Sequence, residues 1–338
     1  MGRILSSEPQ NEDESFVSIR PISLDEYVGQ REVKSRLEVS IQAAKMRGEV
    51  LDHVLLAGPP GLGKTTLAMI IAHETGGHLR ATSGPVIERQ GDLAAVLTSL
   101  SSGDILFIDE IHRLPHVVEE ILYTAMEDFQ LDILVGKGPG ARSVRLSINP
   151  FTLIGATTRS GLLTPPLRNR FGMVLEFDFY DVEDITRIVE RTAKILGVKI
   201  EKECAVEIAK RSRGTPRVAN RLVKRIRDFA TVKSENEITL ETINEAFQAM
   251  KIDPYGLDEV DRKILSKIAE DYHGGPVGLN SLAATIGMEA ETVREVYEPY
   301  LLQGGFVART SRGRIITPKG YAVIGKSLIG FEKFDLEG

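Results

Sequence analysis

A glycine-rich loop between an apolar run and a helical segment constrains this chain more than any other feature. The loop is Gly58-Pro-Pro-Gly-Leu-Gly-Lys-Thr-Thr66, and the apolar run before it covers residues 53–57. Glycines let successive backbone N–H groups turn toward one anion, and the helix that follows presents its N-terminus to the same place. Lys64 can then reach the β and γ phosphates, and the Thr65 hydroxyl can bind Mg²⁺. The loop therefore predicts a nucleoside triphosphate site at the end of a buried strand.

A second motif supplies the groups that hydrolysis of such a nucleotide requires. Residues 105–108 form another apolar run, and Asp109 and Glu110 follow it directly. Asp109 would reach the metal through a water molecule, and Glu110 is the candidate general base for a water in line with the γ-phosphate. A glycine-rich turn alone can be purely structural, but the full loop with this Asp-Glu strand indicates binding and hydrolysis of a nucleoside triphosphate.

Polar side chains after the next strand and helix favour an enzyme in which one subunit contributes to the active site of another. Thr158 follows the apolar run at 152–156, and we favour it over Thr157 as the hydroxyl that orients the attacking water. Arg170 ends a helical segment and has no acidic neighbour in sequence, which suits a guanidinium donated to another subunit's γ-phosphate. Arg168 is the reserve for that role.

A third arginine follows a helix start signal. Thr215 can cap a helix and Pro216 fits its first position, so Arg217 should project from the first turn toward the nucleotide. Taken singly, each arginine is more often a solvated surface residue, but the order and spacing after the two nucleotide motifs favour these roles. His112 and His116 lack a third ligand at zinc spacing, so we interpret both as ordinary polar side chains.

Composition indicates a cytoplasmic protein. The chain has 338 residues, one cysteine and a formal net charge of −6. A single cysteine excludes an internal disulfide framework, no apolar stretch approaches the ~20 residues of a membrane span, and no signal peptide is evident. The net charge argues weakly against a nucleic-acid partner. Residues 299–331, however, contain five Lys or Arg and no acid. For binding to nucleic acid, the charge of such a region matters more than the net charge of the whole chain.

The order of helical and apolar segments predicts three domains. Alternation of the two over residues 19–180 predicts an α/β domain with a parallel sheet, as in P-loop NTPases. Strands then stop, and four helical segments predict a small all-α lid domain over 181–253. Residues 254–338 hold three helical segments and a short hairpin, which is a winged-helix pattern. The polar, acidic stretch 1–18 is expected to be disordered and without function.

The winged-helix segment carries the argument for DNA binding. Its third helical segment, residues 290–303, is acidic and would be a poor reader of a major groove, whereas the wing presents Arg309, Arg312 and Arg314. We therefore expect the wing to contact phosphate rather than bases. Many winged helices bind protein instead, and the pattern alone leaves that alternative open.

An insert at about residues 130–148 has the pattern of a β-hairpin around a glycine-rich turn. Apolar residues on its two strands predict a face without a covering helix. These residues are Leu131, Ile133, Val135, Val144, Leu146 and Ile148. The face could bind a partner, or it could pack on the large domain.

Together these segments resemble the AAA+ ATPases, and among them the RuvB family of bacterial motors for branch migration at Holliday junctions. The resemblance covers about residues 17–330. Besides the two nucleotide motifs it rests on Arg20-Pro-Ile-Ser-Leu-Asp-Glu-Tyr-Val-Gly-Gln30, Gly155-Ala-Thr-Thr-Arg-Ser-Gly161, Arg168-Asn-Arg-Phe-Gly172, Gly214-Thr-Pro-Arg217, Glu298-Pro-Tyr-Leu301 and Arg309-Thr-Ser-Arg-Gly-Arg314.

The resemblance implies a hexameric ring on duplex DNA at Holliday junctions, acting in homologous recombination and DNA repair. Its partners would be RuvA, which recognises the junction and would dock on the hairpin, and RuvC in the resolving complex. Arg309 and Arg314 would contact the DNA backbone. Nucleotide contacts would come from Ile19, Arg20, Tyr27, Gly58, Gly61, Leu62, Gly63, Lys64, Thr65, Thr66, Glu127, Asp128, Phe129, Arg170, Tyr180, Pro216 and Arg217.

Two other classes of protein remain open at this point. One is a clamp-loader-like switch that uses ATP to load a protein ring, and the other is a nucleotide-gated transcription regulator with a winged helix. A regulator should protect one DNA sequence, a clamp loader needs a ring partner, and a motor should convert a four-way junction into duplexes.

Overall fold

The computed structural model describes residues 19–135 and 142–326, so the expected disordered tail at 1–18 lies outside the described residues. Two compact units make up the chain, Met1–Tyr180 and Asp181–Gly338. No helix among the described residues is long and apolar enough to cross a membrane.

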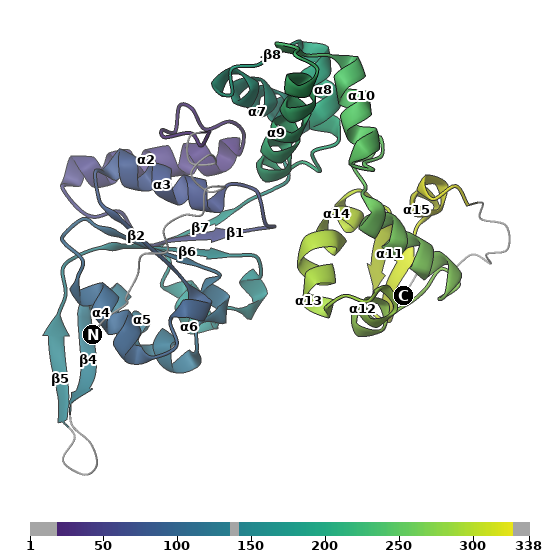
Figure 1. Ribbon diagram of the computed structural model, residues 1–338. Coiled ribbons are helices and arrows are strands. Elements are labelled where there is room, and N and C mark those ends of the chain that lie inside the picture. Colours follow the sequence, from purple (N-terminus) through teal and green to yellow (C-terminus); the bar gives the residue numbers. More distant parts are fainter. Residues whose placement is uncertain (1–18, 136–141, 327–338) are drawn as a thin grey trace. The chain divides into compact units, whose positions relative to one another are not determined.

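A five-stranded parallel sheet organises the first unit (Figure 1). In spatial order its strands are β2 (Leu79–Ser83), β3 (Ile105–Asp109), β6 (Thr152–Thr157), β1 (Val54–Ala57) and β7 (Met173–Glu176). The three apolar runs of the sequence are the three central strands, and they are buried along almost their whole length. Continuous apolar runs of this kind are expected where helices cover both faces of a parallel sheet. The predicted α/β fold is confirmed.

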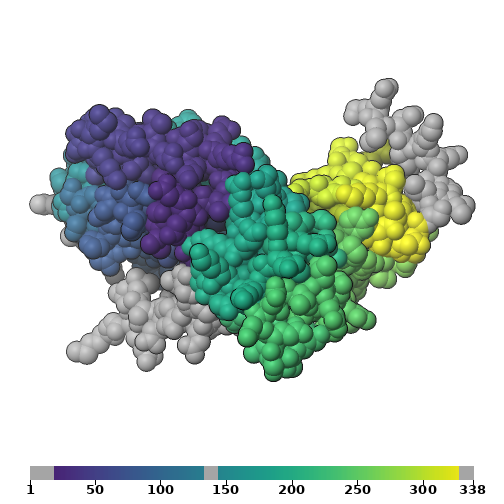
Figure 2. Space-filling model, turned by 90° about the horizontal axis from the view of Figure 1, so that it is seen from above, coloured from purple at the N-terminus to yellow at the C-terminus, as the bar shows by residue number. Residues whose placement is uncertain are grey.

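Helices cover both faces of this sheet. Helices α2 (Arg31–Arg47) and α3 (Lys64–Thr75) lie on one face, and α4 (Gln90–Thr98), α5 (His116–Asp128) and α6 (Pro165–Asn169) lie on the other (Figure 1). Seen from the side of α2, the purple and blue atoms of this early part of the chain form a continuous layer on the unit (Figure 2). The core on the second face joins the sheet to α4 and α5 through Leu55, Leu106, Leu153, Leu93, Leu97, Val118 and Leu122.

The hairpin insert is also present, as β4 (Gln130–Val135) and β5 (Arg142–Ser147). The two strands pair antiparallel, with Leu131 opposite Leu146 and Asp132 opposite Arg145. Because cross-strand partners share one face of a hairpin, the apolar pair and the charged pair lie on opposite faces.

Four helices form the framework of the first part of the second unit. They are α7 (Val182–Ile195), α8 (Lys202–Lys210), α9 (Pro216–Val232) and α10 (Leu240–Ala249). A short parallel pair of strands, β8 (Lys199–Ile200) and β9 (Glu237–Ile238), corrects the expectation that strands stop after residue 181. Two-residue strands are too short to show a periodicity, and Ile238 is held there by full burial.

The rest of the second unit has the winged-helix arrangement. Its helices are α11 (Glu259–Glu270), α12 (Leu279–Ile286), α13 (Ala290–Thr292), α14 (Glu298–Gln303) and α15 (Pro318–Val323), and its wing is β10 (Val307–Thr310) with β11 (Gly313–Ile316). The segment predicted as one helix over 290–303 contains a π-helical turn at Val293–Tyr297. Pro299, in the first turn of α14, has no N–H for a regular i→i−4 bond, which fits a change of helix type just before it.

Candidate active site and nucleic-acid interface

The phosphate loop begins where β1 ends, and glycine is required at two of its positions. Gly58 has φ +143°, and a Cβ there would lie 2.6 Å from the carbonyl oxygen of Phe177. Gly63 has φ +99°, and a Cβ there would lie 3.0 Å from the Tyr27 hydroxyl oxygen. Any other residue at Gly58 would push the loop away from β7.

Lys64 lies at the start of α3 and reaches back over the loop. Its Nζ donates to the carbonyl oxygens of Gly58 at 2.7 Å and Pro59 at 2.8 Å, and the residue is only 7% exposed. The ammonium is thus held over the loop whose backbone N–H groups would receive phosphate. This is the geometry that the sequence predicts for a phosphate-binding lysine.

Asp109 and Glu110 stand at the carboxyl end of β3, on the same sheet edge as the loop, because all five strands run in parallel. The Oδ1 atom of Asp109 accepts a hydrogen bond from the backbone N–H of Glu110 at 3.0 Å. Burial raises the pKa of the Glu110 carboxyl, and the neighbouring charge of Asp109 raises it further. A raised pKa makes the carboxylate a better proton acceptor.

The two threonines at the end of β6 lie differently. Thr158 donates from Oγ1 to Oε2 of Glu110 at 3.2 Å. Thr157 is fully buried, and its Oγ1 lies 2.9 Å from Nδ1 of His112. The structure therefore brings Thr158, the residue favoured from sequence, directly to the candidate base.

His112 is the residue that the sequence interpretation missed. Its Nδ1 lies 3.2 Å from Oε2 of Glu110, so it belongs to the site. His116, by contrast, is 71% exposed and lies 3.6 Å from Glu120 on the surface of α5. Only the left-handed backbone at Glu110, with φ 48°, turns the His112 ring back to the carboxylate, and the sequence shows no signal for that conformation.

A tyrosine pair closes the other side of the loop. Tyr180 donates its single hydroxyl proton to the carbonyl oxygen of Leu62 at 3.2 Å, and its hydroxyl oxygen accepts from the Tyr27 hydroxyl at 3.2 Å. Burial raises the pKa of Tyr27 well above its ordinary value, so the phenol stays neutral. Arg20 reaches Sδ of Met69 in α3 with Nη1 at 3.4 Å, and Ile19 is 2% exposed. Four of the expected nucleotide contacts, Ile19, Arg20, Tyr27 and Tyr180, thus lie beside the loop or the helix that follows it.

Glu127, Asp128 and Phe129, which are expected near a nucleotide, lie away from the phosphate loop of their own subunit. The Phe129 ring packs against His53 and Phe151, with centroid distances of 6.4 and 6.0 Å. Those two residues directly precede β1 and β6, so this segment lies at the amino edge of the sheet. The phosphate loop lies at the carboxyl edge. A segment that connects two parallel strands must return to the amino edge of the sheet, and α5 between β3 and β6 does so.

Arg170 lies at the same amino edge, since it comes three residues before the start of β7. Its Nη2 atom lies 3.2 Å from Oε2 of Glu127, its Nη1 donates to the carbonyl of Pro166 at 2.9 Å, and the guanidinium stacks over the Tyr123 ring at 4.6 Å. Arg170 has no acidic neighbour in sequence, and the fold supplies Glu127 as its partner. Arg170 is therefore remote from its own phosphate loop, as a residue that acts on another subunit must be.

Arg217 is exposed on the first turn of α9. Thr215 caps this helix by accepting from the N–H of Val218 at 3.4 Å, and Pro216 holds the first position, as predicted.

The predicted partner-binding face of the hairpin needs correction. Leu131 is fully buried and Ile148 is 9% exposed, and both belong to the core beside α4 and α5. Val144 and Leu146 are 41% and 39% exposed. The base of the hairpin therefore rests on the domain through β4, and Leu146 on β5, directly opposite Leu131, keeps part of its apolar surface exposed. The side chains of Ile133 and Val135 lie outside the described part of the hairpin.

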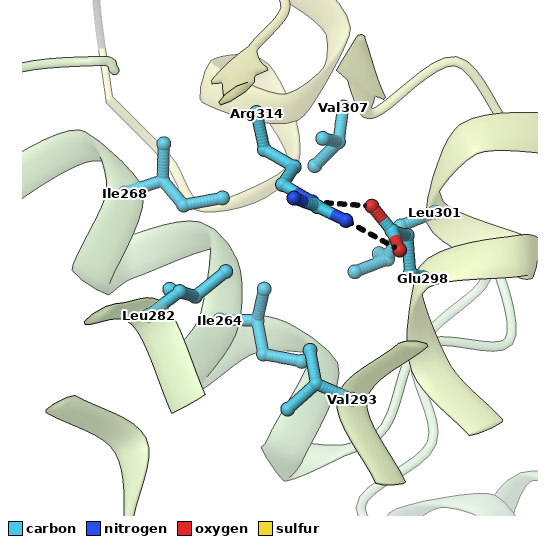
Figure 3. A pocket seen from close by; sticks show the side chains of 8 residues that line it. All are labelled: Ile264, Ile268, Leu282, Val293, Glu298, Leu301, Val307 and Arg314. Carbon is cyan, nitrogen blue, oxygen red and sulfur yellow. Dashed lines mark hydrogen bonds and ion pairs between the residues drawn. The ribbon is translucent and has the colours of Figure 1, made fainter. Parts of the chain in front are cut away.

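The three wing arginines differ in their exposure to solvent. Arg309 and Arg312 are exposed, whereas Arg314 is 8% exposed and donates from Nε and Nη2 to Oε1 and Oε2 of Glu298 at 2.5 and 3.1 Å. Figure 3 shows the guanidinium turned toward this carboxylate and surrounded by apolar side chains. The expectation of three arginines on one basic surface is therefore wrong, because a carboxylate 16 residues earlier pairs with Arg314 inside the domain.

The glycine-rich loop, the Asp-Glu strand and the threonine that reaches it, together with a helical domain and a winged helix, define a P-loop nucleotide-binding ATPase of the AAA+ class. Three family descriptions match the chain: "Holliday junction DNA helicase RuvB P-loop domain" over residues 19–177, "RuvB AAA lid domain" over 180–253 and "RuvB C-terminal winged helix domain" over 254–325. The chain belongs to the RuvB family.

Individual relatives agree with this assignment. The "Holliday junction branch migration complex subunit RuvB" of Kosmotoga olearia is 60% identical over 323 residues, which are 96% of this chain and 94% of that protein. The protein of the same name from Thermotoga maritima is 60% identical over 95% of this chain and 96% of its own length. A solved structure described as the Thermotoga maritima RuvB Holliday junction branch migration motor has a TM-score of 0.86 at 57% identity, covering 92% of this chain and 99% of that one. These likenesses do not favour a clamp loader or a transcription regulator.

Proposed function

We propose that this chain is the ATP-driven motor of branch migration at Holliday junctions. The observation that carries the proposal is the cluster of Lys64, Glu110 and Thr158 at one sheet edge, in a chain 60% identical to proteins named as branch migration complex subunits. We further propose domain boundaries after residues 180 and 253. The division into two units supports the first, and the family matches over 180–253 and 254–325 support the second.

In this proposal the loop N–H groups and Lys64 bind the phosphates of ATP. The hydroxyl of Thr65 and a carboxylate oxygen of Asp109 are the oxygen donors that Mg²⁺ prefers, so the donor set fits this metal, with Asp109 acting through water. Bound Mg²⁺ would neutralise charge on the phosphate oxygens. Glu110 accepts the proton of the attacking water, and Thr158 orients that water. When phosphate binds, the Lys64 ammonium would leave its hydrogen bonds with the two carbonyl oxygens of the loop.

Arg170 would act on the ATP of a neighbouring subunit. Its position at the amino edge, opposite its own loop, supports action in trans and hence a ring, for which we propose six subunits. The pair with Glu127 has to open or turn for the guanidinium to reach a γ-phosphate. Glu127, Asp128 and Phe129 would face the same neighbouring site, and Arg217 would contact the nucleotide from the lid.

Arg309 and Arg312 would hold the DNA backbone without regard to sequence. We propose that the exposed Val144 and Leu146 of the hairpin bind RuvA, that RuvC joins in the resolving complex, and that the protein works in the cytoplasm. The clamp-loader and regulator alternatives lack a supporting observation of this kind.

A synthetic four-way junction with labelled arms tests the proposal. The wild-type protein with RuvA and ATP should convert it to duplexes, and Glu110→Gln protein, which should still bind ATP, should not. Conversion at the wild-type rate by Glu110→Gln protein, or none by the wild type with RuvA, would overturn the proposal.

A further inference from the structure

The ring of His112 links the ends of two strands through buried contacts. Its side chain is 2% exposed, and its Nδ1 atom lies 3.2 Å from Oε2 of Glu110 and 2.9 Å from Oγ1 of Thr157. Thr157 is the last residue of β6, and its Oγ1 also accepts the N–H of Arg159 at 2.9 Å. The orientation of the imidazole is therefore fixed by β6, while its nitrogen faces the carboxylate that follows β3.

The protonation of the ring decides what this contact does. An ionised carboxylate only accepts hydrogen bonds, so the contact with Glu110 is favourable only with a proton on Nδ1. The opposite tautomer would point a nitrogen lone pair at the carboxylate across 3.2 Å. With the proton on Nδ1, His112 donates to Oγ1 of Thr157 at 2.9 Å, and Oε2 of Glu110 lies 3.2 Å from the same nitrogen.

Both polar side chains that reach Glu110 approach the same oxygen. Thr158 donates to Oε2 at 3.2 Å, and His112 approaches Oε2 as well. The backbone N–H of Thr158 also bonds this carboxylate, so the contacts of Thr158 and His112 together set its orientation. When the Thr158 hydroxyl turns to orient the attacking water beside a nucleotide, it must release Oε2, and His112 remains as the side chain that holds it.

We propose that His112 is a positioning residue for Glu110. Its Nδ1–H holds Oε2, and this keeps the carboxylate directed at the attacking water while the Thr158 hydroxyl turns to the nucleotide. The inference rests on the proposed function, since it requires Glu110 to act as the general base.

The first test compares turnover with nucleotide binding. His112→Ala should lower kcat by about tenfold or more, but by less than the ~10²–10⁴-fold that a general base contributes. The Kd for a fluorescent ATP analogue should stay within about twofold, because the ring is placed at Glu110 and not at the phosphate loop. His112→Asn should keep most activity, because its amide N–H can occupy the place of Nδ1–H. The matched control is His116→Ala, which removes an exposed ring from the same segment and should change neither quantity.

A double-mutant cycle separates this role from a structural one. In a Glu110→Gln background the further change His112→Ala should lower the residual rate by less than twofold, because the carboxylate it positions is already gone. An equal loss with and without Glu110 would overturn the inference, and so would a His112→Ala protein with wild-type kcat. If Glu110→Gln protein itself turns over normally, Glu110 is not the base and the proposed mechanism fails first.

If His112→Ala protein does not bind nucleotide, His112→Asn and His112→Gln carry the test. Both introduce an amide, but glutamine places its N–H where Nε2 lies. Higher activity of the Asn variant, by about fivefold or more, supports donation from the Nδ1 position. Equal activities of the two would overturn it.

Discussion

The phosphate-loop edge of the sheet and the wing of the winged helix show how far charged residues can be placed from a sequence. At the sheet edge, Lys64, Glu110 and Thr158 converge because the ends of parallel strands and a glycine-bound loop leave each side chain little choice of direction. On the wing, Arg309 and Arg314 sit directly opposite each other, yet one is exposed and the other is buried on Glu298. A motif fixed by the backbone thus predicts its site, whereas a cluster of surface charges depends on partners elsewhere in the chain.

The largest expected effect belongs to the sheet edge. Lys64→Ala should abolish ATP binding in a fluorescent-nucleotide titration, because the loop loses its only cation. Glu110→Gln should keep binding and lose about 10²-fold or more in turnover, because an amide cannot accept the proton of water. Comparable binding of ATP by Lys64→Ala and wild-type protein would break the claim that this edge is the nucleotide site.

Arg170 extends the comparison to the opposite edge of the sheet. Its removal should reduce hydrolysis by roughly 10³-fold with binding nearly intact. Mixing Arg170→Ala with Lys64→Ala protein should restore some activity, since a mixed interface can combine an intact loop with an intact arginine. Absence of recovery in mixtures shown to assemble would mean that Arg170 acts within its own subunit. Arg168→Ala tests the reserve residue, and a larger loss of hydrolysis there than in Arg170→Ala would assign the role to Arg168.

Removal of buried partners should affect stability rather than catalysis. Arg314→Ala would leave the Glu298 carboxylate buried without its partner, which should cost about 3–5 kcal/mol of unfolding free energy. Arg309→Ala, a change of the same kind at the opposite wing residue, should cost less than about 0.5 kcal/mol. Urea denaturation followed through the winged-helix transition measures both. Equal stabilities of the two variants would show that the Arg314 pair does not hold the wing.

The hairpin offers the same contrast with apolar residues. Leu131→Asp should unfold or strongly destabilise the large domain, because a charge would enter its core. Leu146→Asp should leave folding and basal ATP hydrolysis intact and should weaken stimulation by RuvA. Melting curves and RuvA-dependent hydrolysis distinguish these outcomes, and loss of fold in the Leu146 variant would place that residue in the core as well.

These contrasts show why some features could be predicted and others could not. The central strands are continuous apolar runs, so β1, β3 and β6 were visible in the sequence. The edge strand β2, whose residues are half-exposed or exposed, was not. Among site residues, Lys64 and Glu110 follow from local motifs. His112 belongs to the site because Glu110 has a left-handed backbone conformation. Phe129 lies at the amino edge of the sheet, away from the phosphate loop, because α5 runs from one edge to the other. Arg314 pairs with a carboxylate on another element.

The smallest expected effect concerns the two exposed wing arginines. Changing Arg309 and Arg312 to Ala should make the slope of log K against log salt shallower by about 0.9 for each lost phosphate contact. The affinity should fall alike for unrelated duplexes, because phosphate contacts carry no sequence information. An unchanged slope, or a loss confined to one DNA sequence, would mean that the wing does not hold the backbone.

The central claim is that this chain couples ATP hydrolysis at the sheet edge to movement of DNA held by the wing. ATP turnover and four-way junction dissociation, measured with RuvA on the same preparations, test it most directly. Wild-type protein should perform both, Glu110→Gln protein should perform neither, and the Arg309→Ala, Arg312→Ala double variant should hydrolyse ATP but fail to dissociate the junction. Junction dissociation by Glu110→Gln protein, or equal loss of both activities in the wing variant, would contradict the account.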